Sequence, residues 1–99
     1  MYSLDNLKKL PKLGTLAPEA TSAFWAFDKA ALADGAIPKK YKELMAITVA
    51  LTTQCPYCIE LHRDAARKAG ATEQELAEAI HVAAALRAGA AITHGSHLL

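Results

Sequence analysis

The sequence has little of several features that mark particular classes of protein. It holds only two cysteines, which excludes a small scaffold held together by several disulfides. Eleven Lys and Arg residues stand against ten Asp and Glu residues, and the formal net charge is only +1. There is no basic stripe, so we expect no nucleic-acid partner. The apolar run from Leu44 to Leu51 is far shorter than the ~20 residues of a membrane span, so we expect no membrane partner.

The first residues also lack a secretory pattern. Met1 to Asp5 show no basic region followed by an apolar stretch. We therefore expect a cytoplasmic protein. In that compartment a pair of cysteines is more often catalytic or metal-binding than structural.

The composition favours an all-α fold. The 99 residues are 53% hydrophobic, and much of that share is alanine, a strong helix former. No strand pattern stands out, and glycines and prolines divide the chain into segments of helical length. We predict an extended N-terminal arm over residues 1–16 and a compact bundle of about four to five helices over residues 17–99. The expected helices run from Pro18 to near Gly35, from Pro38 to about Thr53, from Cys55-Pro56 to Gly70, and from a capping box at Thr72 and Glu75 to about Ala91.

The last of these helices is unusually apolar. Between Ala79 and Ile92 only His81, Arg87 and Gly89 interrupt the apolar residues. A helix that is apolar on nearly all sides must be covered on nearly all sides, and three other helices are too few to do so. We therefore expect the chain to associate with copies of itself through this helix.

The two cysteines stand together in Cys55-Pro56-Tyr57-Cys58, and His62 follows four residues later. Residues three apart on a helix have Cβ atoms about 5–6 Å apart, and the first turn can adjust to the ~3.8 Å of a disulfide. The start of a helix also lowers a thiol pKa from about 8.5 into the ~3.5–7.5 range. The pattern thus predicts a redox-active pair, and by the helix-start argument alone Cys55 is the sharper nucleophile.

His62 is the expected base for these thiols. It lies one turn beyond Cys58, and an imidazole with a pKa near ~6.5 can pass protons in either direction. A carboxylate normally sets its tautomer. Glu60 is a poor choice, because two positions along a helix is nearly the opposite face. Glu43 is better, since it begins an otherwise apolar column of the second predicted helix and is expected at the rim of the contact with the third.

Zinc is the alternative use of the same residues. The two thiols and His62, with His81 or His94 as a further ligand, would make a structural site. No second cysteine pair supports it, so the leading interpretation has no metal and no cofactor. His94 is also a candidate to line the thiol site from the fourth predicted helix. The aromatic residues Phe24, Trp25 and Phe27 are expected in the core.

The order Glu43, Cys55, Cys58, His62, with eleven, two and three intervening residues, resembles the pattern of the alkylhydroperoxidase D-like branch of the carboxymuconolactone decarboxylase superfamily. The surrounding segments agree over roughly residues 18–95, including Ala46-Ile47-Thr48-Val49-Ala50 and the tail Thr93-His94-Gly95. The resemblance implies an all-helical fold that assembles as homotrimers or homohexamers. It implies that Cys58 attacks a hydroperoxide, that Cys55 resolves the product, and that His62 and Glu43 relay protons.

By the same resemblance, the substrate is an organic hydroperoxide, and the reductant is an external dithiol or a lipoyl group on a partner protein. The chain departs from the longer alkylhydroperoxidases by lacking an extra N-terminal helical half. The decarboxylase branch lacks the thiol pair, which argues against that activity. Two other interpretations stay open: a thiol–disulfide oxidoreductase or redox sensor without peroxidase turnover, and the structural zinc module.

Overall fold

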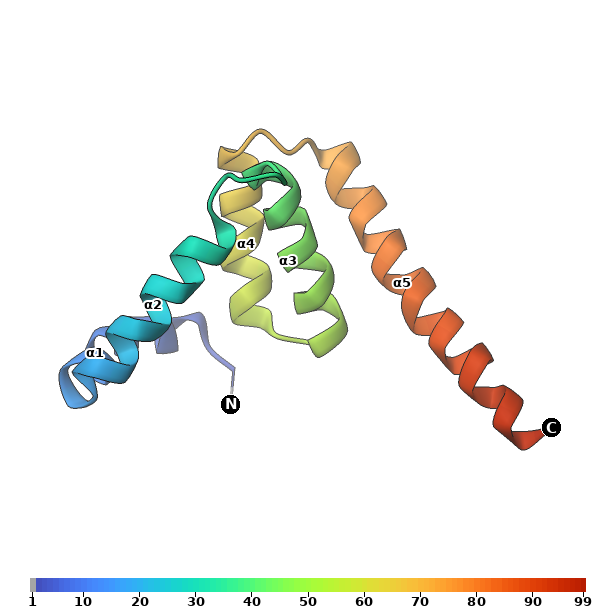
Figure 1. Ribbon diagram of the computed structural model, residues 1–99, viewed down its shortest axis with the longest axis horizontal. Helices are drawn as coiled ribbons and strands as arrows, with labels where there is room; N and C mark the ends of the chain where they lie inside the picture. Colours follow the sequence, from blue (N-terminus) through green and yellow to red (C-terminus); the bar gives the residue numbers. More distant parts are fainter. Residues whose placement is uncertain (1) are drawn as a thin grey trace. The chain divides into compact units, whose positions relative to one another are not determined.

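The computed structural model describes residues 2–99, and the fold over these residues is all-α. Two 3-10 helices, η1 and η2, flank five α-helices (Figure 1). Their bounds are η1 Leu4–Lys9, α1 Leu10–Leu16, α2 Pro18–Leu32, α3 Lys39–Thr53, α4 Pro56–Lys68, α5 Glu73–Gly95 and η2 Ser96–Leu98. The chain divides into two compact units, Met1–Lys39 and Lys40–Leu99. The predicted helix class is confirmed.

The predicted extended arm is wrong, because residues 4–16 are helical. Ser3 caps η1, with its side chain accepting a hydrogen bond from the Asp5 backbone N–H. Leucine recurs at every third position of this segment, the repeat of a 3-10 helix, where residues three apart eclipse. Pro11 then stands in the first turn of α1, where a missing N–H does no harm.

The α2 helix of the first unit begins at Pro18, as predicted, and its aromatic residues are not core residues. Phe24 and Trp25 meet edge to face with ring centroids 5.1 Å apart. Phe24 is 54% exposed and Phe27 is 70% exposed. No described residue of η1, α1 or α2 is buried, so the core lies in the second unit.

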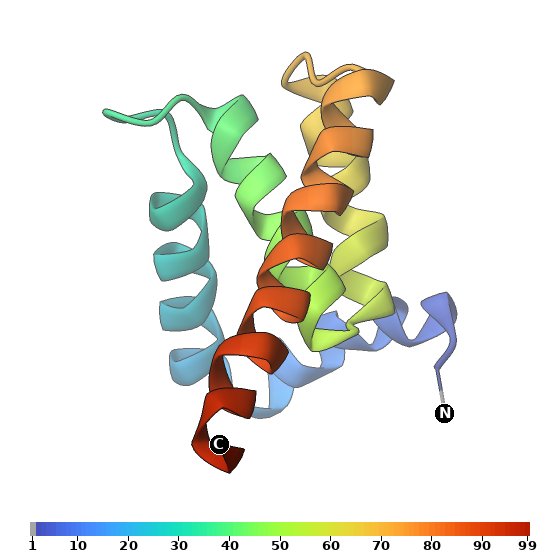
Figure 2. The same ribbon diagram turned by 90° about the vertical axis from the view of Figure 1, so that its right-hand side faces the viewer.

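In the second unit, α3 and α4 lie side by side (Figures 1 and 2). Ile47 of α3, Ala66 of α4 and the neighbouring Ala71 form the buried cluster. Leu44, Leu51 and Leu76 pack against it and are partly buried, so α5 contributes through its first turns. The small side chains at the centre let the helix backbones approach closely.

The beginning of α5 is fixed by the predicted capping box. The Glu75 backbone N–H donates to Oγ1 of Thr72 at 3.1 Å, and the Thr72 N–H donates to Oε1 of Glu75 at 2.9 Å. Lys40 of α3 pairs with Oε2 of the same glutamate at 3.0 Å. The hydrogen bond from the Thr72 backbone, followed by that from Lys40, lowers the pKa of Glu75 below its ordinary value, and the bond to Glu75 raises the pKa of Lys40.

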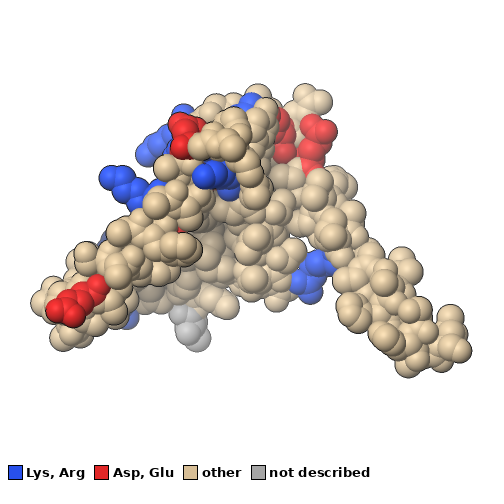
Figure 3. Space-filling model, in the orientation of Figure 1, with Lys and Arg blue, Asp and Glu red and all other residues tan. Residues whose placement is uncertain are grey.

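The rest of α5 extends beyond α3 and α4 (Figure 1) and is apolar and exposed. Val82, Leu86 and Ile92 are 56%, 65% and 78% exposed. Figure 3 shows the C-terminal part of the helix almost without charged groups. By length and composition alone, the segment Glu73–Leu98 could cross a membrane, which the short run Leu44–Leu51 did not suggest. The same features are found in a helix that packs against another protein surface.

Candidate active site

The turn that carries the cysteines is built from the end of α3. The Cys55 backbone N–H donates to the carbonyl of Ala50 at 3.0 Å, and Gln54 has a φ of 56°. This is the Schellman ending of a helix, in which the residue in the left-handed region is usually glycine. The turn holds Cys55 at a fixed place directly after α3, where it also becomes the N-cap of α4.

The two cysteines form a disulfide across the first turn of α4, with their Cα atoms 5.4 Å apart. This separation is ordinary for a disulfide. Cys55 Sγ also accepts a hydrogen bond from the Cys58 backbone N–H at 3.3 Å. Pro56 occupies the start of the helix, where no N–H is needed. Both cysteines are partly buried, so the disulfide is not fully enclosed by the chain.

His62 is paired with Glu43, as the sequence predicted. His62 Nδ1 lies 2.6 Å from Glu43 Oε2, and this contact joins α4 to α3. A carboxylate can only accept, so Nδ1 carries the hydrogen and a neutral ring keeps Nε2 as its basic nitrogen. The ring lies one turn beyond Cys58 on the same face of α4. The bond to Glu43 therefore fixes the tautomer of a ring on the cysteine-bearing face of α4.

The position of Glu43 differs from the expected rim. Its side chain is only 2% exposed, and it is the only charged residue among the buried residues that the structure describes. Burial of a carboxylate is unfavourable unless it is paired and hydrogen-bonded, and His62 provides such a partner. The apolar column Ile47 and Ala50 continues from Glu43 into the core and is likewise buried.

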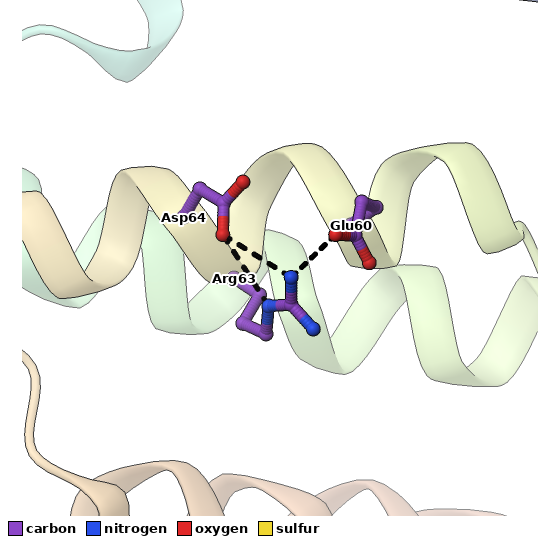
Figure 4. A network of polar contacts seen from close by, with 3 residues as sticks. All are labelled: Glu60, Arg63 and Asp64. Carbon is purple, nitrogen blue, oxygen red and sulfur yellow. Dashed lines mark hydrogen bonds and ion pairs between the residues drawn. The ribbon is translucent and has the colours of Figure 1, made fainter. Parts of the chain in front are cut away.

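Glu60 is engaged elsewhere, as its place on α4 predicted. Arg63 donates through its guanidinium to Glu60 Oε1 and to Asp64 Oδ1, the latter at 3.3 Å (Figure 4). All three residues belong to α4. The charge of Arg63 is thus balanced by two carboxylates of its own helix.

Arg87 of α5 also contacts the cysteine turn, and the sequence analysis missed it. Its Nη1 donates to the backbone carbonyl of Thr52. Thr52 is one of the last residues of α3, and the last four carbonyls of a helix have no donor within the helix. Arg87 supplies a donor for this one. The end of the helix is predictable from the sequence, but no sequence pattern tells which distant residue bonds to its last carbonyls.

The other histidines show no contact with the thiols. The ring N–H groups of His81 and His94 donate to carbonyls of their own helix, Ala77 and Ala90, each at 3.0 Å. The ring of His97 lies near that of His94, with centroids 6.1 Å apart. Over residues 2–99 no group of three or more His, Cys, Asp and Glu side chains could hold a metal ion. The geometry gives the zinc alternative no support.

Comparison with known proteins places this site in a family. Residues 18–99 match the model of the carboxymuconolactone decarboxylase family. The chain is 52% identical over 77 residues to "Uncharacterized protein 4 in cox locus" of Paracoccus denitrificans, covering 78% of this chain and 69% of that protein. It is 34% identical over 87 residues to an uncharacterized protein of Cupriavidus necator, covering 88% and 77%.

Two solved structures share the fold. One is the apo form of a carboxymuconolactone decarboxylase family protein from Legionella pneumophila, with a TM-score of 0.81, 35% identity and coverage of 93% of this chain and 82% of that one. The other is a protein from Methanobacterium thermoautotrophicum, with a TM-score of 0.80, 34% identity and coverage of 86% and 96%. The family match spans most of the sequence and agrees with the fold. The chain belongs to the carboxymuconolactone decarboxylase family, within which it carries a Cys-x-x-Cys pair.

Proposed function

We propose that this protein is a thiol-dependent peroxidase of the alkylhydroperoxidase D-like branch, which reduces organic hydroperoxides. One observation carries the proposal: a histidine with its tautomer fixed by a buried carboxylate lies one turn from a dithiol that can close into a disulfide. A structural disulfide needs no base beside it. A redox cycle does, because a thiol must lose its proton before it attacks.

The first step uses Cys58 and His62. The basic nitrogen of His62 takes the Cys58 proton, and the resulting thiolate attacks the distal oxygen of the hydroperoxide. An S–O bond forms and the O–O bond breaks, so that the sulfur is oxidised to a sulfenic acid. The departing alkoxide takes the proton back from His62 and leaves as an alcohol. Glu43 stabilises the charged ring while it holds the proton.

The second step closes the disulfide. Cys55 attacks the Cys58 sulfur, the S–S bond forms, the S–O bond breaks, and water leaves. The external dithiol, a small molecule or a lipoyl group on a partner protein, then resets the pair by two thiol–disulfide exchanges. The donor ends as its own disulfide, and both cysteines regain their protons.

The test is dithiol-dependent consumption of cumene hydroperoxide. We expect wild type to turn over, Cys58→Ser and Cys55→Ser to lose nearly all activity, and His62→Gln to lose about 10²-fold or more, as for removal of a general base. His81→Gln is the matched control, because this exposed histidine contacts only its own helix. Equal rates for wild type and Cys58→Ser would reject the proposal.

A second candidate is a thiol–disulfide oxidoreductase without peroxide turnover. The hydrogen bond from the Cys58 N–H to Cys55 Sγ favours it, because this bond would also stabilise a Cys55 thiolate able to attack a substrate disulfide. Reduction of insulin by the reduced protein, with no consumption of hydroperoxide, would support this candidate over the peroxidase.

We also propose that the active form is a cytoplasmic homotrimer or homohexamer, joined through the exposed apolar face of α5. Leu86 is 65% exposed and stands in a stretch with Arg87 as its only formally charged residue after Glu78. Sedimentation at micromolar concentration should give an oligomer for wild type and a smaller species for Leu86→Glu. Wild type that sediments as a monomer would contradict this assembly.

A further inference from the structure

A small cavity lies between α3, α4 and α5 of the second unit. Its volume is about 180 Å³, and it is lined by residues of three helices, Ile47 and Leu51 of α3, Ile59 and Arg63 of α4, and Leu76 and Ile80 of α5. All but Arg63 are aliphatic. Ile59 directly follows Cys58 in α4, so one lining residue of the cavity is the sequence neighbour of the cysteine that is proposed to attack.

Arg63 lines this cavity, Arg87 lies farther along α5, and the surroundings of the two arginines differ. The Arg63 guanidinium is already bonded to the carboxylates of Glu60 and Asp64 (Figure 4). Arg87 donates instead to a neutral acceptor, the Thr52 carbonyl, and the contacts of residues 2–99 give it no carboxylate partner. Its positive charge is therefore available to an anion.

The register of α5 places Arg87 on the cavity side. Ile80 and Arg87 are seven residues apart, which is about two turns or ~10.5 Å along one face of a helix. Long side chains on a helix point back toward its N-terminus, and so from Arg87 toward Ile80. On α3, the acceptor Thr52 follows the cavity residue Leu51 directly. The bond therefore holds the guanidinium one residue beyond the cavity lining on α3, on the side of the cysteine turn.

We infer that the preferred substrate is an organic hydroperoxide that carries both an apolar chain and a carboxylate, such as a hydroperoxy fatty acid. The inference rests on the proposed function and names its substrate class. The apolar chain enters the cavity, the carboxylate binds Arg87, and the peroxide group meets Cys58. A guanidinium has five N–H donors, so one bond to Thr52 fixes its position and leaves donors for a bidentate carboxylate.

The first test compares a hydroperoxy fatty acid with its methyl ester, in which a methyl group removes the carboxylate charge. We expect wild type to favour the acid in kcat/KM by about tenfold, as for one charge-assisted hydrogen-bonded pair. This ratio should shrink as ionic strength rises. Arg87→Gln should bring the ratio close to one. Arg87→Lys should keep part of the preference for the acid, because a lysine retains the charge but lacks the two parallel N–H donors of a guanidinium.

The control is Lys68→Gln, which removes an exposed cation in the last turn of α4. It should leave the acid-to-ester ratio unchanged. If Arg87 had only a structural role, Arg87→Gln would lower both activities together and leave their ratio near that of wild type. A wild-type ratio near one, or a ratio that Arg87→Gln does not alter, overturns the inference while the peroxidase itself stands.

A binding measurement separates this inference from the proposed function. Titration of the oxidised wild-type protein with decanoate and with methyl decanoate requires no turnover. Tighter binding of decanoate, lost in Arg87→Gln and kept in Lys68→Gln, supports the site even if no hydroperoxide is consumed. Equal binding of the two ligands, or an affinity for decanoate that does not depend on Arg87, argues against it.

Discussion

The α3–α4 pair and the C-terminal half of α5 use apolar residues in opposite ways. In the pair, Ile47 is 5% exposed and Ala66 is fully buried, and the polar exception Glu43 has a partner in His62. In α5, the similar side chains Leu86 and Ile92 are 65% and 78% exposed. The pair buries its central residues within the chain, although Met45 and Val49 of α3 stay exposed, whereas the end of α5 buries none of its large apolar residues.

The hydrophobic residues of the two regions therefore have different roles, one in folding and one in association. The pair holds the disulfide turn and the His62–Glu43 contact, so the site rests on the region with the buried core. The end of α5 can bury its apolar area only against something else, and we propose that this is another copy of the chain. Stability of the unit and association should therefore respond to different substitutions.

The largest effect should come from Ile47→Ala. Removal of the buried side chain leaves a cavity between α3 and α4 and should lower the free energy of unfolding by about 3 kcal/mol. Ile92→Ala removes the same atoms from an exposed position and should change the unfolding of the isolated chain by less than about 0.5 kcal/mol. Urea denaturation at low protein concentration measures both. Similar losses of unfolding free energy for the two variants would show that the two regions do not differ in this way.

Thr72→Ala should have a smaller effect at the beginning of α5. It removes the side-chain half of the capping box and should lower the free energy of unfolding by about 1 kcal/mol. Ser22→Ala, at an exposed position of α2, is the control and should stay within about 0.5 kcal/mol. An unchanged free energy of unfolding in Thr72→Ala would mean that the first turns of α5 contribute little to the stability of the folded unit.

Gln54→Gly should stabilise the cysteine turn slightly. A non-glycine residue in the left-handed region costs roughly 1–2 kcal/mol, and glycine costs about 0.5–1 kcal/mol in chain entropy. The net gain is then about 0.5 kcal/mol. Gln74→Gly, in the first turn of α5, should instead lose up to about 1 kcal/mol. Thermal denaturation should show a higher melting temperature for Gln54→Gly and a lower one for Gln74→Gly. A lower melting temperature for Gln54→Gly would contradict the strain assigned to Gln54.

The smallest effect concerns the pH dependence of the contact between Glu75 and Lys40. The pKa of Glu75 is lowered in the folded state, so its contribution is present above its unfolded pKa and is lost as the pH falls through the folded one. Stability measured from neutral to acidic pH should therefore fall less steeply for Glu75→Gln than for wild type. Parallel curves would show that the carboxylate makes no pH-dependent contribution.

Much of the fold could be predicted because the helix boundaries are set by residues that lie close to them in the sequence. Pro18 and Pro56 begin helices and Thr72 caps one, and each acts on backbone groups within a few residues. Two fixed periodicities, three and four residues, also sufficed to place Cys58 and His62 on one face and to choose Glu43 over Glu60 as the partner.

The features that could not be predicted from the sequence depend on packing between distant segments. The depth of Glu43 follows from how closely α3 approaches α4, and the bond from Arg87 to Thr52 joins residues 35 positions apart. No local sequence pattern indicates the burial of Glu43 or the bond from Arg87. The helical residues 4–16 are a different case, because the leucine at every third position was visible and favours a 3-10 helix.

The most direct test of the proposed peroxidase is a thiol titration of the fully reduced protein before and after one equivalent of cumene hydroperoxide. Peroxidase chemistry at Cys58 predicts two reactive thiols per chain beforehand and almost none afterward, with one cumyl alcohol formed per chain and both thiols restored by a dithiol. Two thiols that persist after the hydroperoxide, in a folded protein, would contradict it.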